Sequence, residues 1–291
     1  MGAISRRDVV LDAVPVSDIV SELGESPLWI ENTGLRWLDV AGKSLHTRHL
    51  DGSTSSVGLS GTVTAVELSR SDDLFAVTGS GFGWVLPHTG EVRQVADSIS
   101  EPDVTMNDGG IDGLGRCWAG SAVRDDSRRG ELYRFDGASV TSHARGLSMS
   151  NGLDWSPDNT VLYHADSTAG TVTAWDFDLV SGNLGESRIL AEIPASVGLP
   201  DGLTVDEAGD VWLAIWGPGQ VWRLDSRTGE TTAIVDVPTP CTTSCAFGGP
   251  DLRTLYITTA NHERPEGGGL LYAVDAPVGG RHPHRFAGAL R

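Results

Sequence analysis

Four side chains with oxygen donors recur at one position of a repeated sequence pattern. Asn107, Asn151 and Asp201 each open a unit in which a short apolar strand leads through a turn into a second strand, and Glu25 holds the equivalent place before residues 28–30. Carboxylate and carboxamide oxygens are hard ligands that suit Ca²⁺, Mg²⁺ or Mn²⁺ and also accept Zn²⁺. If the fold brings these four side chains together, they form a cage for a divalent cation.

The alternative interpretation is that these residues form turns. Asp-Gly and Asn-Gly pairs are common in turns, and any one of Asn107, Asn151 or Asp201 alone is more typical of a turn than of a ligand. Turn residues, however, would fall at scattered phases of the repeat. The shared register across different repeats favours a common site.

The elements that must position these residues are short strands. Residues 199–213 give a strand, a turn at 207–210 and a second strand rich in β-branched and aromatic residues. Similar units open about 42 to 50 residues apart, and no segment between strands shows the 3.6-residue apolar stripe of a helix. We therefore expect an all-β, six-bladed β-propeller that forms a single domain over residues 1–291, with its units at 21–50, 63–95, 107–141, 151–190, 201–235 and 243–286.

A propeller explains how distant residues can meet. The innermost strand of each blade lines a central channel, and the loops that enter these strands open on one face. We expect Glu25, Asn107, Asn151 and Asp201 to lie in such loops and to converge at one mouth of the channel.

Composition narrows the class of partner. The 21 Lys and Arg residues stand against 39 Asp and Glu residues, a formal net charge of −18, which argues against nucleic acid or an anionic membrane as partner. No apolar run reaches the ~20 residues of a membrane span, and residues 1–20 lack the pattern of a signal peptide. Cys117, Cys241 and Cys245 are too few for a disulfide framework and are wrongly spaced for a zinc knuckle. We expect buried thiols and a cytoplasmic protein.

Several motifs in this order resemble those of a known family. They are LGESPLW at 23–29, NDG at 107–109 with D-x-x-G-R-x-W-x-G at 112–120, SNGLDWS at 150–156, LPDG at 199–202 with D-x-x-G-x-x-W at 206–212, TSC at 243–245 and FGG at 247–249. Together they resemble the senescence marker protein/regucalcin/gluconolactonase family of six-bladed propellers. Each motif alone is weak, but their order and spacing extend over almost the whole chain.

The resemblance implies a metal-dependent lactonase. One divalent cation, Ca²⁺ first with Zn²⁺, Mg²⁺ or Mn²⁺ as alternatives, would be held by Glu25, Asn151 and Asp201, and Asn107 would face the substrate or a metal-bound water. Such a metal polarises the lactone carbonyl and lowers the pKa of bound water, while Asp201 can serve as both ligand and general base. The implied partner is a small lactone or ester, and we expect a monomer or a weak homo-oligomer.

One position departs from the family. Members that act on sugar acids often carry an arginine two residues before the residue matched to Asn107, and this chain has Thr105 there. Threonine cannot supply the bidentate clamp of arginine, and the nearby acidic residues Glu101 and Asp103 do not favour an anionic substrate. A less polar or neutral lactone or ester is therefore expected.

Two further residues are candidates for substrate contact, and other functions stay open. His164 either packs in the channel wall or touches substrate, and Trp216 follows a strand of the fifth unit, while His262 lies in a loop that could gate the mouth. The same metal site could support ester hydrolysis, isomerisation or cyclisation, or the chain could be a non-enzymatic calcium-binding scaffold. A serine hydrolase is poorly supported because no Gly-x-Ser-x-Gly elbow is present.

Overall fold

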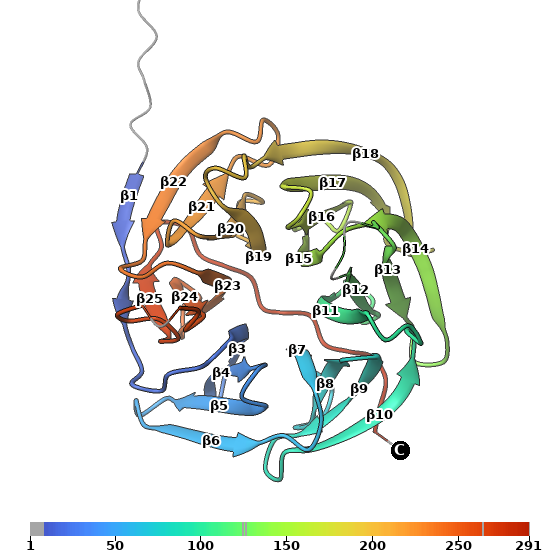
Figure 1. The fold of residues 1–291 in the computed structure, drawn as a ribbon, viewed down its shortest axis with the longest axis horizontal. Coiled ribbons are helices and arrows are strands. Elements are labelled where there is room, and N and C mark those ends of the chain that lie inside the picture. Colours follow the sequence, from blue (N-terminus) through green and yellow to red (C-terminus); the bar gives the residue numbers. More distant parts are fainter. Residues whose placement is uncertain (1–8, 124, 126, 264, 291) are drawn as a thin grey trace, which may run out of the picture.

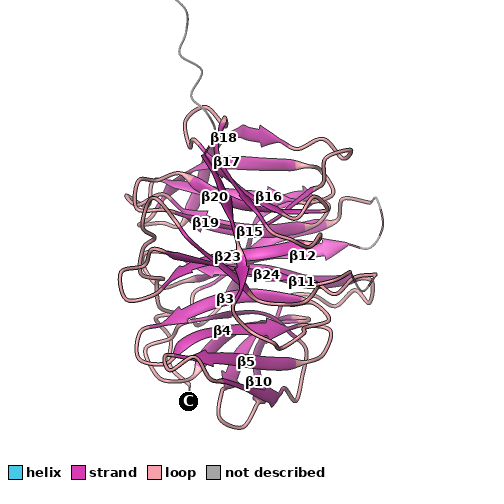
Figure 2. Cartoon of the chain, turned by 90° about the vertical axis from the view of Figure 1, so that its left-hand side faces the viewer, coloured by secondary structure: helices cyan, strands magenta, loops and turns pink. Residues whose placement is uncertain are grey.

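The computed structural model describes residues 9–123, 125, 127–263 and 265–290. Within them, six β-sheets stand around a central axis like the blades of a propeller (Figure 1). The side view shows only strands and loops in this part of the chain (Figure 2). The predicted all-β, six-bladed β-propeller is confirmed.

Blades 1 to 4 are each built from four consecutive strands, the first innermost and the fourth outermost. They are β3 (Gly24–Ile30), β4 (Gly34–Asp39), β5 (Ser44–His49) and β6 (Thr54–Gly58); β7 (Val63–Glu67), β8 (Leu74–Thr78), β9 (Gly81–Leu86) and β10 (Glu91–Asp97); β11 (Val104–Ile111), β12 (Cys117–Val123), β13 (Gly130–Phe135) and β14 (Val140–Leu147); and β15 (Ser150–Trp155), β16 (Val161–Asp166), β17 (Thr171–Asp178) and β18 (Asn183–Glu192).

Blades 5 and 6 are completed by the N-terminal segment. Their inner strands are β19 (Leu199–Val205), β20 (Val211–Trp216), β21 (Gln220–Leu224) and β22 (Thr231–Asp236), and then β23 (Thr242–Gly248), β24 (Thr254–Thr259) and β25 (Tyr272–Asp275). β1 (Val9–Asp12) pairs parallel to β22, and β2 (Val14–Pro15) pairs antiparallel to β25. The expectation that residues 243–286 supply every strand of the sixth unit is therefore wrong.

The expectation that residues 1–20 are not a signal peptide falls partly outside the described part of the chain. Residues 1–8 are not described, and β1 and β2 lie within the rest of this range. Among the residues that are described, no helix is long and apolar enough to cross a membrane.

The C-terminal segment closes the rear end of the channel. The inner strands run from a front mouth, where the predicted ligand residues lie, to a rear mouth. Residues 276–290 cross this rear mouth (Figure 1). Arg281 donates hydrogen bonds to Asp154 at 3.2 Å and to the Trp155 carbonyl at 2.6 Å. This segment therefore ties blade 6 to blade 4, although residues 276–286 were expected to belong to the sixth unit alone.

Aromatic packing anchors the end of this segment between blades 2 and 3. The Phe286 ring stacks on Phe75 with centroids 3.6 Å apart and lies 5.9 Å from Phe135. Its backbone N–H donates to the Leu68 carbonyl at 2.8 Å. Phe286 is 2% exposed, so an element near the end of the chain completes a core between two blades.

We expect Phe286→Ala to lower the free energy of unfolding by about 3–5 kcal/mol, because it removes a buried aromatic ring and leaves a cavity. Urea denaturation followed by tryptophan fluorescence measures this loss. Val180→Ala is the control, because Val180 is 84% exposed and its loss should change stability by less than about 0.5 kcal/mol. Equal stability of Phe286→Ala and wild type would contradict the anchoring role.

Candidate metal centre

A β-bulge interrupts each inner strand near its front end. The register of β11 shifts between Met106 and Gly109, and corresponding shifts follow Glu25 in β3, Ser150 in β15 and Pro200 in β19. Asn107, Asn151 and Asp201 therefore lie in bulges, where the ladder is broken and a side chain can be redirected. The expectation that the site residues lie in loops before the strands is wrong, because all four belong to the strands themselves.

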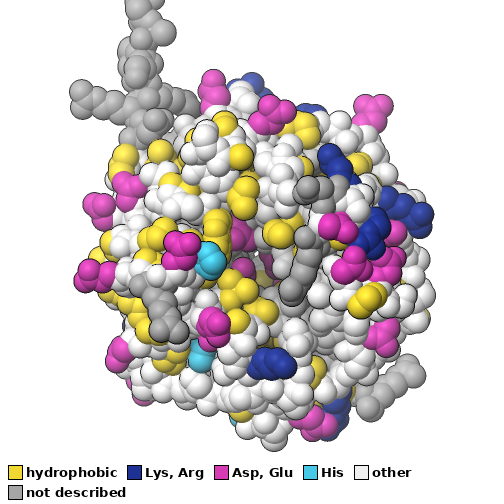
Figure 3. All heavy atoms as spheres, viewed as in Figure 1, with side chains coloured by type: hydrophobic (Ala, Val, Ile, Leu, Met, Phe, Trp, Pro, Cys, Tyr) yellow, Lys and Arg dark blue, Asp and Glu magenta, His cyan; other side chains and the backbone are white. Residues whose placement is uncertain are grey.

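Two carboxylates form the acidic part of the site, with Asp201 buried and Glu25 half-buried. Burial first, and then the charges of Asp201 and Asp108, raise the pKa of Glu25 well above its ordinary value. Burial and the charge of Asp108 raise the pKa of Asp201 in the same direction. The effect of the Asp201 charge on Glu25 is that expected of two carboxylates that lie near each other. Acidic side chains are visible inside the central hollow of the front face (Figure 3).

The residues present fit a divalent cation. Asp201 is 7% exposed, and its Oδ1 atom is buried without a hydrogen-bond partner. In the part of the chain that the structure describes, neither Glu25 nor Asp201 forms an ion pair with Lys, Arg or His. Buried carboxylates need a counter-charge or a proton, and a cation would supply the former.

The site does not depend on a cluster of acidic or histidine ligands. No group of three or more His, Cys, Asp and Glu side chains arranged to hold a metal occurs among the described residues. The predicted set has only two carboxylates, since its third member is an asparagine. A neutral third ligand leaves the two negative charges of Glu25 and Asp201 to balance the +2 charge of one ion.

Both asparagines use their amide N–H groups on the protein. Asn151 donates from Nδ2 to Ser167 Oγ at 3.0 Å, and Asn107 donates from Nδ2 to the Ser150 carbonyl at 2.8 Å. Because one amide carries its donors and its acceptor on opposite sides, these bonds leave the amide oxygen to act as a ligand or acceptor. Ser167 and Ser150 were not predicted as supporting residues, and the sequence offers only their positions next to Asp166 and Asn151 as a signal.

His164 supports the site from behind. Its Nε2 lies 2.7 Å from Ser150 Oγ, its side chain is 2% exposed, and burial lowers its pKa to about 4. A neutral imidazole therefore fixes Ser150, whose carbonyl holds Asn107. Direct contact of His164 with substrate does not fit this burial, whereas packing in the channel wall does.

The other predicted contact residues surround the front mouth at different depths. Thr105 is half-buried in β11, opposite Ala122. Glu101 is exposed and forms an ion pair with Arg129, which also pairs with Asp103. The negative charges that we expected to repel an anionic substrate are thus partly neutralised.

Trp216, the three cysteines and Asp108 occupy different parts of the propeller. Trp216 ends β20, opposite Leu199, and its ring lies 5.7 Å from the ring of His262. Cys117, Cys241 and Cys245 are free and buried, which confirms the expectation of unpaired thiols. Asp108, which follows Asn107, also lines the channel, and burial raises its pKa to about 6.

The fold and the residues at the front of its inner strands define a six-bladed propeller in which two carboxylates and two carboxamides occupy equivalent positions. Residues 23–261 match the family described as "SMP-30/Gluconolactonase/LRE-like region". The chain belongs to this family, as the sequence motifs predicted.

Individual relatives cover nearly the whole chain. YvrE of Bacillus subtilis (strain 168), named as a candidate sugar lactone lactonase, is 33% identical over 96% of this chain and 99% of its own length. Regucalcin of Gallus gallus is 32% identical over 91% of this chain and 95% of its own. The crystal structure of a calcium-binding protein, regucalcin, from Agrobacterium tumefaciens superposes with a TM-score of 0.88 at 25% identity, over 96% of this chain and 99% of that one.

The buried His164 should make stability depend on pH. Its pKa is about 4 in the folded protein against 6.5 ordinarily, so the unfolded chain binds the proton more readily. The stability due to a neutral His164 is present above about pH 6.5 and is lost as the pH falls toward 4, to a total of about 3 kcal/mol. His164→Gln should therefore show a shallower loss of stability than wild type between these pH values.

Chemical denaturation at a series of pH values measures this difference. His88→Gln is the control, because His88 is exposed and its replacement should leave the pH dependence of wild type unaltered. Parallel curves for His164→Gln and wild type would show that His164 is not held neutral by the fold.

Proposed function

We propose that this protein is a divalent-metal-dependent hydrolase that opens a lactone ring, with Ca²⁺ as the first candidate metal. The observation that carries the proposal is the pair of carboxylates, the half-buried Glu25 and the buried Asp201, with Asp201 Oδ1 lacking a hydrogen-bond partner. Family membership supports lactone hydrolysis as the general activity. YvrE is named for sugar lactones, and the A. tumefaciens regucalcin is described as calcium-binding.

Each residue has a definite part in this proposal. Glu25, Asn151 and Asp201 would hold the cation, which when bound polarises the lactone carbonyl and stabilises the developing oxyanion. Asn107, fixed through Ser150, presents its amide oxygen to the substrate or to water. Asp201 takes the proton of the attacking water at a carboxylate oxygen and later returns it to the leaving alkoxide.

A different reaction at the same site is the second candidate. Thr105 replaces the arginine clamp of many sugar-acid lactonases, which favours a changed substrate, such as a neutral ester, or a changed outcome such as isomerisation or cyclisation. Each of these reactions also begins with a polarised carbonyl. A non-enzymatic calcium-binding scaffold would retain the metal and lack turnover, so the next experiment separates it from an enzyme.

We expect Glu25→Gln and Asp201→Asn each to weaken metal binding and to reduce lactone hydrolysis at least 100-fold, since each removes a ligand charge and Asp201→Asn also removes the base. Mass spectrometry for metals and acid release from a panel of lactones measure the two effects. Wild type should hold about one divalent ion per chain.

Glu67→Gln provides the matched control. Glu67 is a carboxylate deeper in the same channel, and burial raises its pKa, so a neutral amide of the same shape should preserve metal content and turnover. Unchanged turnover of Asp201→Asn would remove Asp201 as the base. Metal without hydrolysis in wild type would favour the scaffold, and a metal-free wild type would refute the proposal.

We expect Thr105→Arg to raise kcat/KM for aldonolactones about three- to tenfold, because a guanidinium two residues before Asn107 can donate two parallel hydrogen bonds to substrate oxygens. Thr105→Lys is the control, since lysine adds the charge without the planar fork. Steady-state kinetics on glucono-1,5-lactone measures the change. An equal gain in both variants would indicate charge alone, and no gain in Thr105→Arg would contradict the missing-clamp explanation.

A further inference from the structure

A second hollow adjoins the metal centre on the front face. It lies where blades 5, 6 and 1 meet, it encloses about 550 Å³, and its walls include Leu23, Ala41, Trp216, Ala260, Asn261 and His262. We call it the seam groove. Its volume falls within the range of small-molecule sites, roughly 300–1,000 Å³.

The walls of the seam groove are continuous with the strands that carry the two acidic ligands. Leu23 stands two residues before Glu25 and forms an isolated β-bridge with Ala260. Trp216 lies opposite Leu199 in the ladder, two residues before Asp201. A group bound in the groove would therefore lie only two residues along the strands from Glu25 and Asp201.

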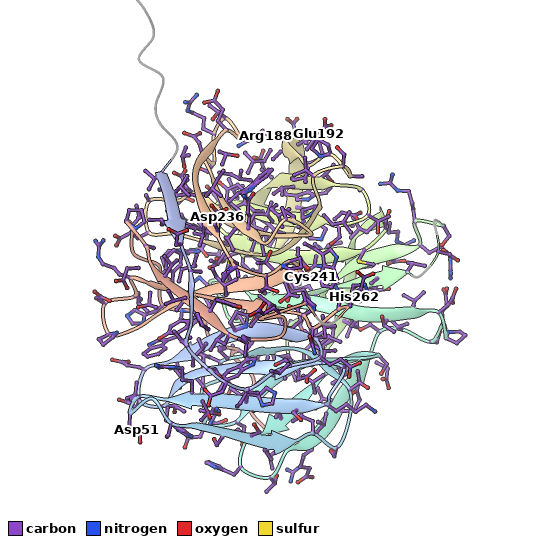
Figure 4. All side chains as sticks on the ribbon, turned by 60° about the vertical axis from the view of Figure 1, so that its left-hand side comes forward. Asp51, Arg188, Glu192, Asp236, Cys241 and His262 are labelled. Carbon is purple, nitrogen blue, oxygen red and sulfur yellow. The ribbon has the colours of Figure 1, made fainter. Side chains whose placement is uncertain are left out.

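Cys241 marks the short distance between the groove and the site. The backbone N–H of Ala260 donates to the Cys241 carbonyl at 3.0 Å, and Figure 4 labels Cys241 together with His262. Burial, followed by the charges of Glu263 and Asp201, raises the pKa of the Cys241 thiol. The charges of a groove residue, Glu263, and of a metal-site residue, Asp201, therefore both act on the Cys241 thiol.

One side of the lining is apolar and aromatic, while Glu22, Asn261 and Glu263 supply its polar part. The Trp216 and His262 rings lie 5.7 Å apart and are tilted by 50°, so they form two faces of one aromatic corner. Leu23 and Ala260 contribute aliphatic surface beside them. Hydrophobic side chains and a histidine are visible next to the central hollow (Figure 3). Flat rings pack favourably in such a corner, by stacking or edge-to-face contact.

Two exposed carboxylates define which charge the groove accepts. Glu22 and Glu263 both line it, and both are exposed. Their field repels a carboxylate or phosphate on a ligand, whereas a neutral group enters without this cost.

We propose that the seam groove binds a neutral, flat, apolar substituent of the substrate, so that the protein prefers aryl-substituted lactones to free aldonolactones. The lactone carbonyl then reaches Glu25 and Asp201 while the ring system packs against Trp216 and His262. The inference rests on the proposed function for the ring-opening step and adds the class of substrate. Trp216 is its principal specificity-determining residue.

The test compares two lactones on one set of variants. Dihydrocoumarin carries a fused aromatic ring, and glucono-1,5-lactone carries only hydroxyl groups. Trp216→Ala should raise KM for dihydrocoumarin at least tenfold, with kcat changed by less than threefold, and should shift the ratio of the two kcat/KM values at least fivefold toward glucono-1,5-lactone. Trp216→Phe, which keeps a flat ring, should recover most of the loss.

Two controls separate this inference from the proposed function. Val180→Ala is distant and exposed, and should leave the ratio unchanged. Coumarin binding to Asp201→Asn, measured by equilibrium dialysis, reports the groove without turnover and should weaken at least fivefold when Trp216→Ala is added.

The outcomes fall on different sides of the two proposals. Equal effects of Trp216→Ala on both lactones, or no effect on dihydrocoumarin and coumarin, would overturn the inference while leaving metal-dependent hydrolysis intact. Retained hydrolysis by Asp201→Asn would instead overturn the proposed role of the metal site, and coumarin binding would still decide the groove.

Discussion

The structure depends on one electrostatic constraint, which is that the buried Asp201 and the half-buried Glu25 form no ion pair among the described residues. Burial and the charge of Asp108 raise the pKa values of both carboxyl groups, and the charge of Asp201 also raises that of Glu25, so the fold alone leaves this region short of positive charge. Asp108, deeper in the channel, adds to the deficit. A propeller can tolerate such a cost because six sheets supply a large apolar core away from the axis. A bound cation converts the same cost into affinity.

The neutral part of the site is held by hydrogen bonds within the protein. Asn151 is oriented by Ser167 and Asn107 by the Ser150 carbonyl, and Ser150 itself is held by the buried imidazole of His164. Each of the two asparagines therefore has a partner that orients its amide group. Such support is what keeps ligands within the small displacements that coordination and catalysis allow.

The blades and the four oxygen-bearing residues could be predicted because their signals are local in the sequence. These signals are turns, short strands and an equivalent position in each repeat. It did not predict the bulges that hold Asn107, Asn151 and Asp201, since a bulge is defined by the register of a partner strand. The closing strands were also missed. β2 has two residues, Val14 and Pro15, and carries no pattern of its own, so only the geometry of ring closure places it. The rear closure by residues 276–290 is likewise a non-local contact.

The departure at Thr105 and the seam groove point to the same conclusion from opposite sides of the mouth. At β11 a donor suited to hydroxyl-rich or acidic substrates is replaced by a threonine, and at the meeting of blades 5, 6 and 1 an aromatic corner is present. Arg129 cannot compensate freely, because Glu101 and Asp103 already engage its guanidinium. Under the proposed function, a threonine in place of the clamp and an aromatic corner in the groove would both lower the affinity for polyols relative to aryl lactones. Since specificity is a difference of affinities, the two features would act in the same direction, while Glu25 and Asp201, which we propose as metal ligands, need not change.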